Sequence, residues 1–234
     1  MRPADLHWQP LTNSQDGSYD SLAMAWDILT SRGSLSQQTA AHLLQTAERF
    51  GPFIQRRVFA LPVPGEVPRA VRTLTDIREN LDIGFLLNVY GPPQGFPERE
   101  LWILCARLGL SFGAGGSFDW LTPGVTLPLL SVTPFGLTDA FSLANVHSGM
   151  HHEGVTIGFS VPLCISPSQA LQGCFHVANT LARELRGETF DDENRRLTPR
   201  IQEEYRTNLR QALAAFSQTG MTTGSPEAIK LFDS

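Results

Sequence analysis

The stretch that decides the fold is VTIGFSV, residues 155–161. Its large apolar side chains alternate with Thr156, Gly158 and Ser160, which is the period-two pattern of a β-strand with one buried face. Residues 166–187 then change to the 3.6-residue apolar repeat of an amphipathic helix. This change of period predicts a strand whose apolar side packs against a helix, and therefore a domain of the α+β class.

Two amphipathic helices are expected in the second half of the chain. Ser166-Pro167 and Thr198-Pro199 each place a good N-cap residue before a proline, which suits the first turn of a helix. The first helix is expected to end at Gly187, and the second to bury an apolar stripe from Ile201 to Phe216. From Gly220 onward the chain is polar, and we expect a flexible tail over residues 220–234.

Towards the N-terminus, the same patterns predict more strands and another helix. Strands are expected at Ile83–Val89, Val125–Val132 and Ala140–Val146, and a helix at Pro97–Leu108. Together with the two later helices, these elements make up a predicted binding domain over residues 81–219.

Residues 1–80 form a separate predicted region of helices and linker, and no motif indicates its role. Helical spacing is present in Tyr19–Thr30 and in Ser36–Phe50, and Arg57–Leu61 is expected to be a strand. The prolines and the glycine between Pro62 and Pro68 indicate a turn-rich connection.

Each predicted strand has two faces, because side chains alternate across it. The expected core face carries Phe85, Leu87, Val89, Phe141, Leu143, Val155, Ile157, Phe159 and Val161. The opposite face, called the outer face below, carries Gly84, Leu86, Asn88, Ser142, Ala144, Val146, Thr156, Gly158 and Ser160. A solvated sheet face usually carries charges, and this one has none. Two explanations are open: other parts of the chain, such as the helices before Gly51, cover this face, or it is a shallow groove for a partner segment such as an amphipathic helix.

The composition excludes several functional classes. The chain has 234 residues and a net charge of −5, which argues against a basic nucleic-acid-binding surface. The longest apolar runs are short and interrupted by proline and glycine, so we expect no transmembrane segment and no membrane insertion by this chain. Cys105, Cys164 and Cys174 form no paired motif and are expected to be buried, reduced thiols.

The sequence contains no strong catalytic or metal-binding motif. The densest polar cluster lies between two predicted strands and consists of His147, His151, His152 and Glu153. Its spacing is not that of a zinc site, and a solvated loop explains it. Asp191 and Asp192 are followed by Arg195, which favours a charged turn over a catalytic carboxylate pair. We therefore predict no catalytic residues, no bound metal, no cofactor and no enzymatic activity.

Short segments occur in a characteristic order: Asn88-Val89, Phe141–Asn145, Gly154–Ile157, Val161-Pro162, Asp191-Asp192, Arg195-Arg196, Thr198-Pro199 and Tyr205. In this order, with matching helices between them, they resemble one family, the C-terminal FtsZ-binding domain of the bacterial cell-division protein ZipA. No single segment is specific, but the ordered set is fairly specific. The resemblance covers about residues 82–216.

The resemblance implies a split β-α-β type fold, with an antiparallel sheet backed by helices on one face. It implies a non-enzymatic protein that binds the C-terminal tail of FtsZ, a largely helical segment, in a shallow apolar cleft on the open sheet face. It further implies a role in division-ring and septum assembly, and a location in the cytoplasm at the inner-membrane face of the division site. The matching cleft positions are Gly84, Leu86, Ala144, Val146, Thr156 and Gly158.

Two of these positions depart from the family pattern. Gly84 replaces a valine, and Gly158 replaces a phenylalanine that forms much of the cleft wall. Burying a phenylalanine is worth about 2 kcal/mol, so tail binding is expected to be weaker unless Phe118, Trp120 or an aromatic residue of the N-terminal segment compensates. The alternative function is a diverged module of the same fold that binds a different partner, or that covers its own outer face.

Overall fold

The structure is a computed structural model and describes residues 22–30, 33–60, 62–113, 115–125, 127–135 and 140–233. In chain order, the elements are β1 (Leu29–Thr30), β2 (Gly33–Ser34), α1 (Gln37–Phe50), the 3₁₀ helix η1 (Pro64–Glu66), α2 (Val67–Leu81), β3 (Gly84–Tyr90), β4 (Phe96–Pro97), α3 (Glu98–Arg107), β5 (Ser111–Phe112), β6 (Phe118–Trp120), β7 (Leu130–Pro134), α4 (Leu143–Ser148), β8 (His151–His152), β9 (Gly154–Ser160), α5 (Pro167–Leu185), β10 (Glu188–Asp191), α6 (Pro199–Gln218) and α7 (Pro226–Phe232).

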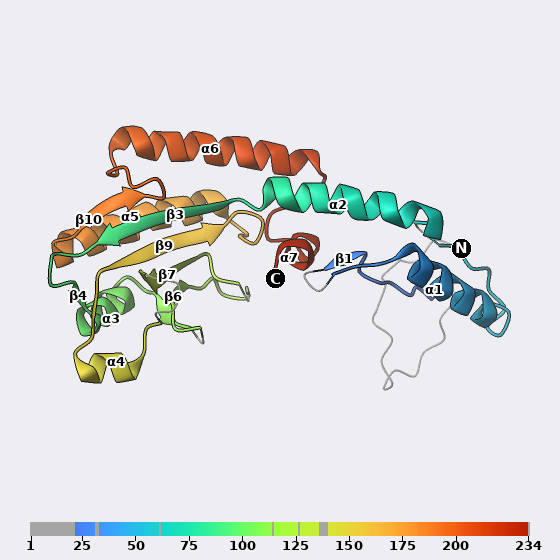
Figure 1. Ribbon diagram of the computed structural model, residues 1–234, viewed down its shortest axis with the longest axis horizontal. Coiled ribbons are helices and arrows are strands. Elements are labelled where there is room, and N and C mark those ends of the chain that lie inside the picture. Colours follow the sequence, from blue (N-terminus) through green and yellow to red (C-terminus); the bar gives the residue numbers. More distant parts are fainter. Residues whose placement is uncertain are drawn as a thin grey trace, which may run out of the picture.

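Six strands form one antiparallel sheet in the order β10-β3-β9-β7-β6-β5 (Figure 1). The two longest strands, β3 and β9, lie side by side and pair from Gly84–Ser160 to Tyr90–Gly154. Helix α5 packs along one face of the sheet, and α6 packs against α5. The predicted α+β class with an antiparallel sheet backed by helices is therefore confirmed.

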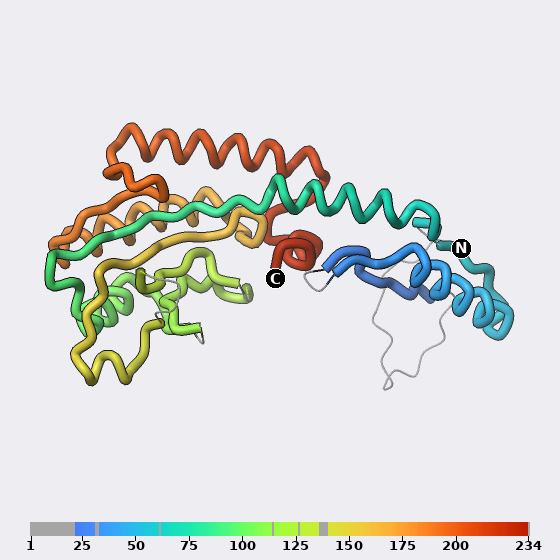
Figure 2. Tube along the Cα trace, viewed as in Figure 1, coloured from blue at the N-terminus to red at the C-terminus, as the bar shows by residue number. Residues whose placement is uncertain are grey.

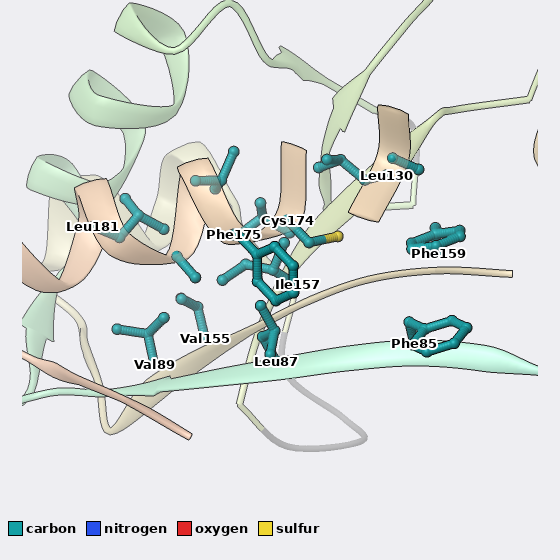
Figure 3. Close-up of a cluster of buried hydrophobic side chains, with 14 of the residues drawn as sticks. Phe85, Leu87, Val89, Leu130, Val155, Ile157, Phe159, Cys174, Phe175 and Leu181 are labelled. Atoms are coloured by element: carbon teal, nitrogen blue, oxygen red, sulfur yellow. The ribbon is translucent and has the colours of Figure 1, made fainter. Parts of the chain in front are cut away.

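The main core lies between the sheet and α5, with further contributions from α3 and α6. In Figure 3, Leu87 of β3 and Ile157 of β9 point towards Cys174 and Phe175 of α5, and Phe85 lies beside Phe159. Except for Leu143, all the residues predicted for the core face are buried. Because burial of one large apolar side chain contributes about 1.5–3 kcal/mol, this face holds the domain together.

Local capping explains why several helices begin where the sequence predicts. The Ser36 hydroxyl accepts a hydrogen bond from the Thr39 N–H at 3.0 Å, and the Thr198 hydroxyl accepts one from the Ile201 N–H at 3.3 Å. Ser166 precedes α5 without a side-chain capping bond, and Pro167 occupies the first turn. The structure thus confirms four predicted helices, with ends that agree to within one or two residues. They are those over Ser36–Phe50 and Pro97–Leu108 and the two in the second half of the chain.

The N-terminal region differs from the prediction in three elements. Residues 22–28 have no regular structure and Leu29–Thr30 form β1, so the predicted helix over Tyr19–Thr30 is wrong wherever the structure describes it. Residues 57–60 are not a strand. Helix α2 was missed because Pro68 resembles a helix breaker, but in the first turn it interrupts no hydrogen bond.

The expected tail over residues 220–234 contains the helix α7 instead. The Ser225 hydroxyl caps it by accepting from the Ala228 N–H at 3.2 Å. A second buried cluster forms around it from Leu29, Leu81, Phe216, Ala228, Leu231 and Phe232. Figure 2 shows the C-terminal helix beside the junction of α2 and β3, so segments from both ends of the chain pack together.

None of the helices in the described ranges combines the length and the apolar character needed to cross a lipid bilayer.

Candidate functional site

The outer face consists of rows of residues that oppose one another across the strands. One row runs through Leu86 of β3, Gly158 of β9, Ser131 of β7 and Asp119 of β6. The next row runs through Phe190 of β10, Asn88, Thr156 and Thr133. Directly opposed residues in a sheet point to the same side, so both rows lie on the face away from α5.

The outer face is open. Gly84 is exposed, and Leu86, the large aliphatic side chain at its centre, is 46% exposed. The described helix before Gly51, α1, lies against η1 and α2 beyond the end of the sheet (Figure 1). That helix therefore leaves the outer face accessible.

Leu86 lies across Gly158, and this contact shapes the centre of the face. A Cβ atom added at Gly158 would collide with the Leu86 side chain and would lie 2.7 Å from the Phe85 carbonyl oxygen. At Gly84, by contrast, the nearest atom to an added Cβ is the Phe159 carbonyl oxygen at 3.6 Å, which is ordinary contact. The apolar surface here is thus supplied by Leu86, and Gly158 makes the space for it.

Hydroxyl groups surround this apolar centre and hydrogen-bond along the rows. The Thr156 hydroxyl donates to Asn88 Oδ1 at 2.9 Å. The Ser131 hydroxyl donates to Asp119 Oδ1 at 2.7 Å, and the Ser117 hydroxyl donates to the same oxygen at 2.9 Å. These hydroxyls thus bond to side chains of the same face, whereas the Ser160 hydroxyl, opposite Gly84, is buried and has no hydrogen-bond partner among the described residues.

The predicted strand over Ala140–Val146 is wrong, and this correction removes two residues from the predicted cleft. Helix α4 forms here and packs against α3. The Ser142 hydroxyl caps its first turn, and Gly149 ends it with a left-handed φ of 72°. Ala144 and Val146 therefore lie on α4 and not on the outer face, whereas Gly84, Leu86, Thr156 and Gly158 lie where predicted.

The strand that pairs with β9 on this side is β7, and its outer residues are Ser131 and Thr133. The predicted strand at Val125–Val132 overlaps β7 only at its end, since β7 spans Leu130–Pro134, and its pairing with β9 was not predicted. The alternation of Leu130 and Val132 with Ser131 and Thr133 was the available signal.

The histidine cluster is dispersed in the structure. His152 is buried, with its Nε2 2.7 Å from Glu98 Oε2, and His151 Nδ1 lies 2.9 Å from the Gln94 carbonyl oxygen. His147 lies on α4, where its Nδ1 is 2.6 Å from the Leu143 carbonyl oxygen. In the described part of the chain, no three or more His, Cys, Asp or Glu residues are grouped as metal ligands.

The Asp191–Asp192 pair forms a structured turn that also supports Leu86. Asp191 is fully buried and accepts from the Arg195 Nε–H at 2.7 Å, and this bond raises the pKa of Arg195.

The Tyr205 hydroxyl lies 2.8 Å from Asp192 Oδ1 and 3.0 Å from the Leu86 carbonyl oxygen, and it can donate its proton to either. Burial raises the pKa of Tyr205, so the hydroxyl keeps this proton. Pairing with β10 ends at Leu87, and the Tyr205 hydroxyl lies beside the Leu86 carbonyl oxygen just beyond that end.

The three cysteines are buried, as predicted. Burial raises the pKa of the Cys105 and Cys174 thiols to about 12 and that of Cys164 to about 11. Such thiols stay protonated at neutral pH and are poor nucleophiles.

A protein family matches the part of the chain that contains the outer face. Its description is "ZipA, C-terminal FtsZ-binding domain", and the match covers residues 85–208, from β3 into α6. A search of curated proteins gives no match. The matched residues make up more than half of the chain and include five strands of the sheet in full, most of β3, and α3 and α5. The chain therefore belongs to the ZipA C-terminal FtsZ-binding domain family, a non-enzymatic, protein-binding family of cell division.

Proposed function

We propose that this chain binds the C-terminal segment of FtsZ on the outer face and thereby supports assembly of the division ring and septum. The observation that carries the proposal is the open, nearly uncharged outer face centred on Leu86, inside the residues that match the family. The proposed contact residues are Gly84, Leu86, Thr156 and Gly158.

A helical segment with one apolar side suits this face. Its apolar side would cover Leu86, and its polar edges would meet the hydroxyls of Ser131, Thr133 and Thr156. Leu86 is about half exposed in the free protein. Burying the rest of its side chain contributes about 1 kcal/mol, which is about fivefold in affinity.

Titration of a fluorescently labelled peptide of the FtsZ C-terminal segment tests this proposal. We expect saturable binding that Leu86→Ser weakens about fivefold, because the substitution removes the apolar contact. Ala144→Ser is the matched control, since Ala144 is exposed on α4 and away from the outer face. Loss of binding in both variants, or in neither, would contradict the assignment of the site.

A second candidate is a module of the same fold that binds a different peptide. The observation that favours it is the hydroxyl-rich edge around Leu86, which includes Asp119 and is more polar than a purely apolar tail requires. If the FtsZ peptide shows no saturable binding at high micromolar concentration while the protein remains folded, this candidate replaces the first.

Binding to FtsZ would place the chain at the division site, on the cytoplasmic face of the inner membrane. A fluorescent fusion should then form a band at mid-cell that depends on Leu86. A diffuse signal in cells with intact division rings would contradict this location.

A further inference from the structure

A second apolar surface lies in the region before β3, beyond the end of the sheet (Figure 1). Residues 22–28, α1 and the connection to α2 surround an open groove of ≈ 810 Å³. One wall is the apolar stripe of α1, formed by Ala40, Leu43, Leu44 and Ala47, and α1 contains no buried residue. An amphipathic helix normally buries its apolar stripe. The apolar stripe of α1 is therefore suited to contact with another molecule or a membrane.

The connection between α1 and α2 extends this surface outward, at the end of the molecule farthest from the sheet (Figure 1). Phe53 is 84% exposed and Phe59 is 87% exposed, more than any other large hydrophobic residue in the described ranges. The rings of Phe50 and Phe53 lie 6.1 Å apart. A group of exposed aromatic side chains at one end of a protein is typical of a surface that contacts another molecule or a membrane.

Positive charge accompanies these aromatic residues. Residues 48–72 contain five arginines and two glutamates, a net charge of +3 in a chain whose net charge is −5. Two of the arginines, Arg56 and Arg57, line the groove, and the other described residues that line it are uncharged. In α6 every arginine forms an ion pair with a glutamate, but Arg49 and Arg57 form none with the residues that the structure describes.

We propose that this surface docks on an anionic lipid bilayer. We call it the basic-aromatic tip and define it by Arg49, Phe50, Phe53, Arg56, Arg57 and Phe59. The aromatic rings enter the interface between head groups and acyl chains, and the guanidinium groups meet the lipid phosphates. Phe50 and Phe59 line the groove, but Phe53 stands outside it, so the exposed aromatic surface extends beyond the groove walls that would hold a peptide. The tip therefore fits a broad anionic surface better than a single peptide.

Co-sedimentation of the full chain with lipid vesicles tests the proposal. We expect binding to phosphatidylcholine vesicles that contain phosphatidylglycerol, and little binding to phosphatidylcholine alone. Added salt should weaken binding, because it screens the arginines. Arg49→Gln with Arg57→Gln should reduce partitioning roughly fivefold for each arginine. Phe53→Ser with Phe59→Ser should reduce it roughly tenfold or more.

Matched variants outside the tip separate this effect from general loss of charge or apolar surface. Arg99→Gln with Arg107→Gln removes two exposed arginines of α3, and Ile103→Ser with Leu143→Ser removes two exposed apolar side chains. Both controls should bind vesicles like the parent protein. All substituted residues are exposed, and circular dichroism should confirm that every variant is folded.

Several outcomes would overturn the proposal. One is that the protein does not bind anionic vesicles at low salt. Another is that it binds neutral vesicles equally well. A third is that the tip and control variants lose vesicle binding to the same extent. Absence of vesicle binding together with saturable binding of an acidic amphipathic peptide would assign the tip to a protein partner instead. Titration of the tip variants with the FtsZ peptide keeps this result separate from the proposed function, because the outer face is unchanged in them.

Discussion

Gly84 and Gly158 lie on the same face of neighbouring strands but in different surroundings. At Gly84 an added side chain would have room, and the residue is exposed. At Gly158 it would collide with the Leu86 side chain and lie 2.7 Å from the Phe85 carbonyl oxygen, so both the neighbouring leucine and the backbone of β3 require glycine here. Leu86 supplies the apolar surface at this point of the outer face, and the missing side chain at Gly158 leaves room for it.

Substitution of each glycine by valine separates the two positions. Gly84→Val should stabilise the protein by about 0.5–1 kcal/mol, because valine favours the strand and loses less backbone entropy than glycine, and it should strengthen peptide binding. Gly158→Val should destabilise it by about 1–3 kcal/mol through overpacking. Urea unfolding measures both changes. Equal stability of the two variants would contradict the steric requirement for glycine at position 158.

At the scale of elements, Glu98 joins three parts of the structure. Its Oε2 meets His152 Nε2 in β8 at 2.7 Å, and its Oε1 accepts from the Ser142 N–H before α4 at 2.6 Å and from the Trp102 indole N–H at 3.2 Å. Glu98 and His152 are both buried. This pair explains why a histidine-rich segment forms an ordered connection between α4 and β9.

Removal of the Glu98 carboxylate should leave buried donors without a partner. We expect Glu98→Ala to destabilise the protein by about 3 kcal/mol or more, and Glu98→Gln by less, because the amide oxygen can still accept from Ser142. Glu100→Ala, at an exposed position in the same helix, should change stability by less than about 0.5 kcal/mol. A similar effect of Glu98→Ala and Glu100→Ala in urea unfolding would refute the role of Glu98.

At the scale of the whole molecule, α7 joins the C-terminus to the region before β3. Phe232 and Phe216 lie with ring centroids 5.9 Å apart, and Leu29 and Leu81 complete the cluster. Phe232→Ala should therefore cost about 3 kcal/mol or more, the usual cost of a phenylalanine removed from a core. Lys230→Ala, which removes only an exposed ion pair with Asp27, should cost less than about 1 kcal/mol. Equal thermal stability of the two variants would indicate that α7 is not needed for folding.

Much of the matched domain was predictable from local pattern. The alternation in β3 and β9 identified both faces, and the 3.6-residue repeat identified α5 and α6, because burial of one face leaves a strong periodic signal. Elements with short or weak repeats were harder to predict. The apolar alternation at Phe141 and Leu143 suggested a strand, although Ser142 and Gly149 held the capping signals of a helix.

The sequence by itself determined the fold class, the core face of the central strands, the family, and the position of Gly84, Leu86, Thr156 and Gly158 on the opposite face of the sheet. Only the tertiary structure decided that β7 pairs with β9, that Leu86 fills the space above Gly158, and that α7 packs against the start of the domain. Local periodicity records whether a residue is buried, but it does not record which distant segment buries it. Pairing and packing depend on contacts between residues far apart in the chain, and these form only when the whole chain has folded.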